Sequence, residues 1–122
     1  MHKFKITTGK SGQFTAKFVY NAEILIWSET YKSRTSARNC IASVQKNGPA
    51  ASVVDLSDGE SGKGYRFEVV EAKGGQHFVR FVARNGQVLM RSETYAAKAS
   101  ALNCIASVKK NGPGAPVEVE PA

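Results

Sequence analysis

The chain has 122 residues, of which 42% are hydrophobic and 22% charged, and its formal net charge is +7. These values are typical of a soluble globular protein with one modest core, and no apolar run approaches the roughly 20 residues of a membrane-spanning helix. The N-terminal segment MHKFKITTGK lacks the apolar stretch of a secretory signal, so we expect a cytoplasmic protein without a membrane contact. The positive charge favours an anionic partner or nucleic acid, although the basic residues are scattered.

The chain contains two copies of one sequence unit. Residues 28–49 read SETYKSRTSARNCIASVQKNGP and residues 92–113 read SETYAAKASALNCIASVKKNGP, so 16 of 22 positions are identical at a shift of 64. Such identity indicates a tandem duplication. Because a unit of about 60 residues is marginally stable alone, we expect one fused domain over 1–122. It comprises repeat 1 (1–56), a linker (57–64) and repeat 2 (65–120).

Repeat 1 begins with predicted strands and continues into a helix. Alternating apolar and polar residues predict strands at 4–7 and 14–20, and a nearly continuous apolar run predicts a third at 23–28. Ser33 is the expected N-cap of the helix. We expect the helix to end at Asn47-Gly48-Pro49, with Asn47 or Gly48 as a C-cap in the left-handed conformation. The expected buried face has the i, i+3, i+4, i+7 spacing, with Ala37, Cys40, Ile41 and Val44. A fourth short strand is predicted at 51–56.

Repeat 2 shows the same series, with strands predicted at 65–70, 77–84 and 87–92 and a last one at 115–120 in which Val117 and Val119 face inward. Asn85-Gly86 predicts a type I′ hairpin turn. Ala97 replaces the N-cap Ser33, a loss of about 1 kcal/mol.

Repeat 2 is one residue longer than repeat 1. Matching Phe4 to Phe67 and Phe14 to Phe78 places the extra residue in the turn at 72–76. In this register the strands differ between the copies, with Ala16 against Arg80, Lys17 against Phe81 and Trp27 against Arg91.

Each unit therefore reads β-β-β-α-β, or β-β-β-α if the last strand does not form. Three hairpin-linked strands followed by a helix predict an α+β fold in which the helix covers an antiparallel sheet. Two equivalent units would pack about a pseudo-two-fold axis as an intramolecular pseudo-dimer. We accordingly expect a monomer.

Two features shared by the copies are candidates for binding. The Ser-Glu-Thr-Tyr segment between the third strand and the helix is a loop with a carboxylate and a phenol; alternatively its side chains only pack and satisfy loop amides. A small polar helix stripe is either a ligand face or a side that packs near the other repeat: Ser36, Asn39, Ser43 and Lys46, recurring as Ser100, Asn103, Ser107 and Lys110. The candidate binding residues are Ser28, Glu29, Tyr31 and Asn39 with their equivalents Ser92, Glu93, Tyr95 and Asn103.

The remaining polar side of the helix differs between the copies. Arg34, Arg38 and Gln45 are replaced by Lys98, Leu102 and Lys109. Such variation is typical of a freely solvated face.

No arrangement of residues indicates catalysis, a metal or a cofactor. Gly9-Lys10-Ser11 lacks the first glycine of a phosphate-binding loop and the helix that should follow. Neither histidine has a metal ligand at the required spacing. Cys40 and Cys104 lie on the apolar helix face, where burial raises a thiol's pKa, so we expect reduced and unreactive thiols. We therefore expect that the protein is not an enzyme.

Two functions remain open. The first is a non-catalytic binding or interaction module with two equivalent sites near the Ser-Glu-Thr-Tyr loops. The alternative is weak, sequence-tolerant nucleic-acid binding through a basic sheet face, although alternation assigns many of the aromatics to the core. The residues of that face are Lys17, Arg66, Arg80, Arg84 and Arg91, interleaved with Phe18, Phe78 and Phe81.

The repeated pattern resembles the YegP-like family of small bacterial proteins. Its motif is N-G-x-x-(I/V/L)-x-x-S-E-x-Y followed by a helix ending in I-x-S-V-x-K-N. Repeat 2 carries it from Asn85-Gly86 through Ser92-Glu93-Thr94-Tyr95 to Asn111, and repeat 1 departs from it in having Ala22 for the Gly. The resemblance implies tandem α+β units packed as a pseudo-dimer, with single-copy relatives pairing as homodimers. It implies no activity and no site residues.

Overall fold

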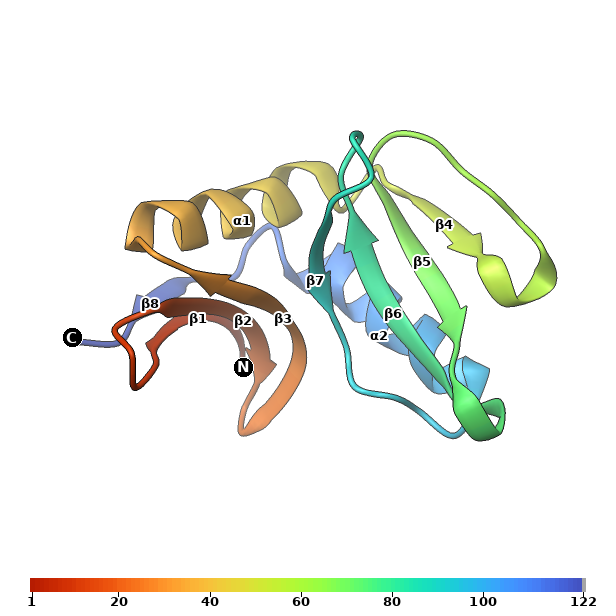
Figure 1. The fold of residues 1–122 in the computed structure, drawn as a ribbon, viewed down its shortest axis with the longest axis horizontal. Coiled ribbons are helices and arrows are strands. Elements are labelled where there is room, and N and C mark those ends of the chain that lie inside the picture. The colour runs from red at the N-terminus through yellow and green to blue at the C-terminus, as the bar shows by residue number, and fades with distance from the viewer. Residues whose placement is uncertain (122) are drawn as a thin grey trace.

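The computed structural model describes residues 1–121 and shows one eight-stranded sheet with two α-helices (Figure 1). Its elements are β1 (His2–Thr8), β2 (Phe14–Tyr20), β3 (Glu23–Tyr31), α1 (Arg34–Asn47), β4 (Ser52–Asp55), η1 (Leu56–Asp58), β5 (Arg66–Glu71), η2 (Lys73–Gly75), β6 (His77–Val82), β7 (Val88–Arg91), α2 (Lys98–Asn111) and β8 (Val117–Val119). The predicted α+β class with two tandem repeats is confirmed. Within the described residues, neither helix is long and apolar enough to cross a membrane.

The two repeats exchange their last strands. The order across the sheet is β4-β5-β6-β7-β3-β2-β1-β8. The pairs β1–β2, β2–β3, β5–β6 and β6–β7 are antiparallel, as hairpin-linked strands must be. In contrast, β4 of repeat 1 pairs in parallel with β5 of repeat 2, and β8 of repeat 2 pairs in parallel with β1 of repeat 1. The sheet is therefore mixed, and both edges tie one repeat to the other.

The two halves of the sheet meet at β3 and β7. These antiparallel strands have one paired position, Trp27 opposite Arg91. The two residues are 64 positions apart and so are equivalent in the repeats. The pseudo-two-fold axis therefore passes between them, and the exchanged strands and the shared core join the halves as well.

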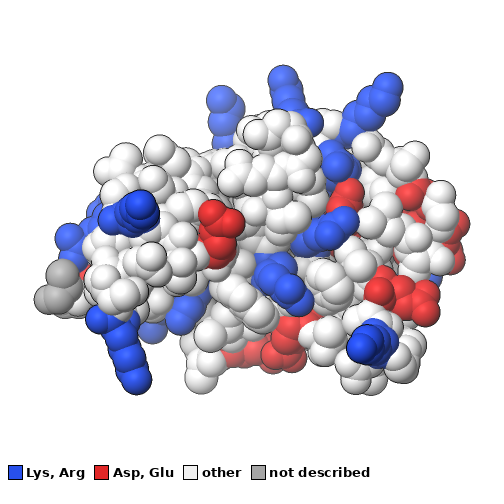
Figure 2. Space-filling model, viewed as in Figure 1, with Lys and Arg blue, Asp and Glu red and all other residues white. Residues whose placement is uncertain are grey.

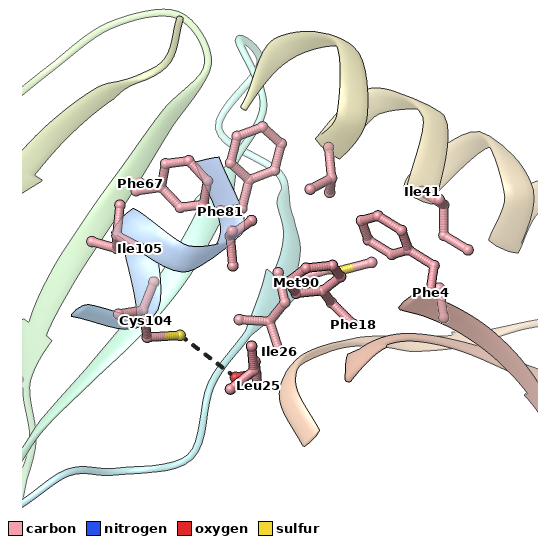
Figure 3. Close-up of a cluster of buried hydrophobic side chains, with 14 of the residues drawn as sticks. Phe4, Phe18, Leu25, Ile26, Ile41, Phe67, Phe81, Met90, Cys104 and Ile105 are labelled. Atoms are coloured by element: carbon pink, nitrogen blue, oxygen red, sulfur yellow. Dashed lines mark hydrogen bonds between the residues drawn. The ribbon is translucent and has the colours of Figure 1, made fainter. Parts of the chain in front are cut away.

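Both helices cover the same face of the sheet, where one core spans the two repeats (Figure 3). Phe4 packs on Phe18 with ring centroids 4.6 Å apart, and Phe67 packs on Phe81 at 4.8 Å. The predicted helix faces are buried as expected: Ala37, Cys40, Ile41 and Val44 in α1, and Ala101, Cys104, Ile105 and Val108 in α2. Within residues 1–121, the opposite face of the sheet carries no α-helix and is called the open face below.

The ends of the helices confirm the N-cap prediction and correct the C-cap prediction. The Ser33 hydroxyl accepts a hydrogen bond from the Ser36 amide, whereas Ala97 provides no side-chain cap. Gly48 follows α1 with φ −59°, so it is right-handed rather than left-handed. Its amide still donates to the Val44 carbonyl, and a Cβ at this position would lie 2.5 Å from that oxygen. Close approach of the backbone, and not a positive φ, therefore explains this glycine.

The prediction of a type I′ turn at Asn85-Gly86 was wrong. Gly86 has φ 87°, but Asn85 is not in the left-handed region that a type I′ turn needs. The Gly86 amide donates to the Ala83 carbonyl, and the Ala83 amide donates to the Gln87 carbonyl. This is a three-residue loop that ends in a left-handed glycine.

The extra residue of repeat 2 lies in this loop and not in the turn at 72–76. The turns after β1 and β5 have equal length, because β1 ends at Thr8 and β5 at Glu71, a shift of 63 that persists at Phe14 and His77. The shift becomes 64 only after the β6–β7 loop. Lys17 is therefore equivalent to Arg80 and not to Phe81. Residue type in the strands is better preserved than the sequence register suggested.

The prediction for the last strand holds in part. Val119 packs against the core, whereas Val117 is 39% exposed. The parallel pair with β1 places Val117 beside Phe4 and Val119 beside Ile6. Of the two valines of β8, only Val119 therefore packs against the core.

Candidate binding clefts

The first cleft lies between helix α1 and the β6–β7 hairpin of the other repeat and measures about 530 Å³. One wall carries the small polar side chains of α1 together with a tyrosine that ends β3. The other wall comes from repeat 2. The lining residues are Tyr31, Ser36, Asn39, Cys40 and Ser43 on the first wall, and Tyr65, Ala83, Arg84, Asn85, Gln87 and Leu89 on the second.

The second cleft is related to the first by the pseudo-two-fold axis and measures about 340 Å³. It lies between helix α2 and the β2–β3 hairpin of repeat 1. Its lining residues are Tyr95, Ser100, Asn103, Cys104 and Ser107 on the helix wall, and His2, Tyr20, Glu23 and Leu25 on the hairpin wall.

The two walls of each cleft differ in how well they match between the clefts. All five residues of the helix wall are identical, since each residue of α1 or β3 has its equivalent 64 positions later. The hairpin walls share their leucine but otherwise differ. At equivalent positions the first has Tyr65, Ala83 and Gln87 where the second has His2, Tyr20 and Glu23, and Arg84 and Asn85 of the longer loop line only the first. The clefts therefore combine a constant helix wall with a variable hairpin wall.

The hairpin wall of each cleft contains a stack of three side chains. In the first cleft, Tyr65 stacks on Phe81 at 6.0 Å, and the Arg84 guanidinium lies 5.7 Å from the Tyr65 ring. In the second, His2 stacks on Phe18 at 5.6 Å and contacts Tyr20 at 4.4 Å. The same three layers recur with different chemistry, so the outer layer is a cation in one cleft and a phenol in the other.

His2 partly fills the second cleft. Its Nε2 lies 3.0 Å from the Ser107 hydroxyl on α2 and bridges the two walls. Burial lowers the pKa of its imidazole below the usual 6.5. In the first cleft no hydrogen bond joins Tyr65 to Ser43 within the described residues, which agrees with the larger volume there.

The cysteines lie at the base of the clefts and donate to the other repeat. Cys40 Sγ lies 3.5 Å from the Leu89 carbonyl, and Cys104 Sγ lies 3.7 Å from the Leu25 carbonyl (Figure 3). Burial raises the pKa of each thiol to about 11, as the apolar helix position predicted. Both are therefore protonated at neutral pH.

The tyrosines are also neutral. Burial, together with the adjacent cysteines, raises the phenol pKa of Tyr31 and of Tyr95 well above the usual 10. With the serine hydroxyls and the asparagine amide, they give each helix wall neutral hydrogen-bonding groups only.

The Ser-Glu-Thr-Tyr segment was predicted to be a loop, but in repeat 1 it forms the end of β3. The structure separates its residues into three roles. Ser28 is 4% exposed, and its hydroxyl accepts from the Ala16 amide at a β-bulge and donates to the Glu29 carbonyl. Ser92 is fully buried and makes the same pair of bonds to the Val79 amide and the Glu93 carbonyl. These serines are structural, Glu29 and Glu93 are exposed outside the lining, and the tyrosines line the clefts.

The polar helix stripe divides as well. Its serines and its asparagines, the candidates Asn39 and Asn103, line the clefts. Its lysines, Lys46 and Lys110, do not.

The helix side interpreted as freely solvated is not entirely so. Gln45 Nε2 donates to the Ala115 carbonyl at 3.1 Å, and the equivalent Lys109 Nζ donates to the Ala51 carbonyl at 2.7 Å. Each helix thus holds the segment that leads to the other repeat's exchanged strand. The residue type differs between the copies because both an amide and an ammonium can donate to a carbonyl.

The sequence reasoning missed the hairpin wall. Its residues are far in sequence from the helix they face, and they differ between the copies, so neither spacing nor repetition marks them. The available signal was the predicted pseudo-two-fold symmetry, because such symmetry could have been used to place the hairpin of each repeat against the helix of the other. Among residues 1–121, no group of three His, Cys, Asp or Glu side chains is placed to hold a metal.

The sequence and the fold both match known proteins. A family model described as a domain of unknown function (DUF1508) matches residues 10–55 and again 72–118. The chain is 51% identical over 57 residues to a UPF0339 protein of Caulobacter vibrioides, covering 47% of this chain and 97% of that protein. It is 41% identical over 98 residues to a UPF0339 protein of Bordetella pertussis, covering 80% of this chain and 77% of that protein.

The solution NMR structure of yegP from E. coli, described as a protein of unknown function, has the same fold. The TM-score is 0.77 at 31% identity, covering 98% of this chain and 92% of that one. The chain therefore belongs to the UPF0339 family of YegP-like proteins and contains two DUF1508 repeats.

Proposed function

We propose that the protein is a non-catalytic binding module with two pseudo-symmetric clefts. The main support is that the residues that line the helix walls of the clefts are also identical in the two repeats. The helix-wall residues Tyr31, Ser36, Asn39 and Ser43 are identical in the second repeat, and all of them line a cleft. Packing alone accounts for the buried serines Ser28 and Ser92, but it does not require open hydroxyl and amide groups at matching places.

The size and chemistry of the clefts favour a small polar ligand. Volumes of about 530 and 340 Å³ fall in the usual range for small-molecule sites. The neutral donors and acceptors of the helix wall suit an amide, a hydroxyl or a peptide backbone. The hairpin wall then sets the preferred charge, because Arg84 favours an anionic group in the first cleft and Glu23 a cationic group in the second.

The absence of catalysis is part of the proposal. Each cleft holds one thiol with its pKa raised to about 11, and therefore a weak nucleophile at neutral pH. A carboxylate enters one cleft only, as Glu23. A cleft pair built for one reaction would be expected to repeat its acid or base, and these clefts repeat neutral groups instead.

Binding can be tested by chemical-shift perturbation of the ¹⁵N-labelled protein with a library of neutral amides, amino acids and small carboxylates. We expect shifts at Asn39 and Ser43 or at Asn103 and Ser107. Asn39→Ala should abolish shifts in the first cleft and leave the second unchanged. Asn103→Ala should do the reverse, so each variant is the matched control of the other.

Two outcomes would contradict the proposal. One is a library that shifts neither cleft at millimolar concentration. The other is binding that moves these resonances but survives both asparagine variants, since the ligand would then not use the helix wall.

A further inference from the structure

A row of charged and aromatic side chains crosses the open face of the sheet. The strand registers place Glu68 beside Arg80, Arg80 beside Arg91 and Arg91 beside Trp27. The row continues from Trp27 to Lys17, from Lys17 to Lys5 and from Lys5 to Glu118. Seven strands thus contribute one residue each, and directly paired residues point to the same face. Figure 2 shows Lys and Arg side chains gathered over β6 and β7 in the middle of the view.

The acidic residues at the two ends of the row are neutralised. Glu68 is buried and contacts Arg66 at 2.8 Å and Arg80 at 2.6 Å. Glu118 contacts Lys3 at 2.9 Å and Lys5 at 4.0 Å.

The middle of the row holds cations without an acidic partner. Neither Lys17 nor Arg91 forms an ion pair within residues 1–121. They flank Trp27 on its two sides. The centre of the open face is therefore a half-exposed indole between two unpaired positive charges.

Arg91 presents a flat surface beside this indole. Its guanidinium lies 4.7 Å from the centroid of the Phe78 ring, over which it is held. A planar guanidinium and an indole ring are both surfaces on which a nucleobase can stack.

Two cation positions of this face recur in both repeats, whereas the equivalent of Arg91 is Trp27 and the equivalent of Lys5 is Glu68. In the register that the structure establishes, Lys17 is equivalent to Arg80, and Lys3 is equivalent to Arg66. At these two positions the positive charge is retained although the residue type is not. What the positions share is charge, and a phosphate backbone requires no more than that.

We propose that the open face binds single-stranded nucleic acid, with Trp27 and Arg91 stacking on bases and Lys17 and Arg91 contacting phosphates. From Lys5 to Arg80 the row crosses five strands, about 19 Å at the usual strand spacing. This length spans several nucleotides. Single strands fit better than a duplex, because the aromatic surface is useful only where bases are unstacked and accessible.

The site is independent of the clefts. The helices and both clefts lie on the covered side of the sheet, so variants on the open face leave the cleft residues intact. Failure of one proposal is therefore distinguishable from failure of the other.

Trp27 is the one tryptophan in the sequence, so its fluorescence reports directly on the open face. We would titrate the full chain with oligo(dT) and oligo(U) of about 15 nucleotides at low salt. We expect quenching of Trp27, and an affinity that falls steeply with salt. Lys17→Gln with Arg91→Gln should weaken binding about tenfold or more. It should also reduce the slope of log K against log salt by about 1.4, because each of two phosphates that are no longer neutralised accounts for about 0.7.

The matched control is Lys46→Gln with Lys110→Gln, which removes the same charge from equivalent exposed helix positions. This control double variant should retain most of the affinity for the oligonucleotides. Equal loss in both double variants would overturn the site, because only net charge would matter. Binding of poly-glutamate or polyphosphate as tight as that of oligo(dT), without selective quenching by the oligonucleotide, would overturn the assignment to nucleic acid. No binding at low salt would overturn the proposal as a whole.

Discussion

Trp27 and Arg91 are equivalent residues of the two repeats, and they are also direct neighbours across the pseudo-two-fold axis. In a symmetric dimer of one repeat, the residue at this position would face its own copy. Two arginines facing each other would repel, whereas an uncharged tryptophan beside arginine avoids that repulsion. Fusion of the repeats allows the two sides to differ.

Trp27→Arg should therefore destabilise the protein by about 1 kcal/mol, since like charges would then face each other across the junction. Adding Arg91→Trp restores an arginine–tryptophan pair in the opposite order. We expect this double variant to regain most of the loss in urea denaturation, and the penalty of the single variant to shrink at high salt. Additive losses in the double variant would show that the two residues do not interact.

Ser28→Ala and Ser92→Ala should each lower the free energy of unfolding by about 1–3 kcal/mol. Each substitution leaves a buried strand amide, that of Ala16 or Val79, without its acceptor. Ser36→Ala, on an exposed cleft wall, should change stability by no more than about 0.5 kcal/mol. If the buried serines behave like Ser36 in thermal denaturation, the bulge does not depend on them.

The sequence predicted the elements well wherever their signals are local. Helix α1 was predicted from its N-cap Ser33 and the buried positions Ala37 to Val44, and both features are set within one or two turns. Strand β2 was predicted at its observed bounds, 14–20, because alternation of side chains marks a half-buried strand.

Features that depend on distant residues could not be predicted in the same way. The pairing of β4 with β5 of the other repeat is fixed by the core and not by any local pattern. The extra residue was assigned to the wrong turn because Phe14 and Phe78 match by residue type. In the structure Phe14 pairs with Tyr31 just as His77 pairs with Tyr95, so Phe14 is equivalent to His77 and not to Phe78. The helix wall of each cleft was found from repetition, and the hairpin wall, which is not repeated, was missed.

Ala97→Ser should stabilise the protein by about 0.5–1 kcal/mol. Ala97 has φ −115° and ψ 137°, the extended conformation of an N-cap, but it has no side-chain oxygen to accept from a backbone amide in the first turn of α2. Ser33→Ala is the converse change at the equivalent position and should be destabilising by a similar amount. A gain is expected in urea midpoint with an unchanged slope; no gain would mean that water already satisfies that helix end.

Stability should fall as the pH rises above about 9. The pKa of Cys40 and of Cys104 is raised from 9.0 to about 11 in the folded protein, so the unfolded chain loses its thiol protons first. The stabilisation is complete below pH 9 and is lost as pH rises from 9 through 11. Cys104→Ser, which does not titrate there, should flatten the decline measured by denaturation between about pH 8 and 11. An unchanged decline would assign it to other groups, such as Tyr31 and Tyr95, whose phenol pKa is also raised.

The strand exchange predicts what one repeat does alone. A fragment of residues 1–62 retains β4 but lacks the β5 on which it pairs, and its β1 lacks β8. A second copy supplies both, and Gln45 can then donate to Ala51 of the partner copy as it donates to Ala115 here. We therefore expect a homodimer by light scattering, with a denaturation midpoint that rises with protein concentration.

A fragment of residues 64–122 is the matched control. Its dimer would bring Arg91 against Arg91 at the axis, where the first fragment brings Trp27 against Trp27, so it should dissociate at higher concentration and recover at high salt. Arg91→Trp should strengthen this second dimer toward the first. A folded monomer of either fragment would show that the exchanged strands are dispensable, and equal dimer affinities would show that the residue on the axis does not govern how the repeats associate.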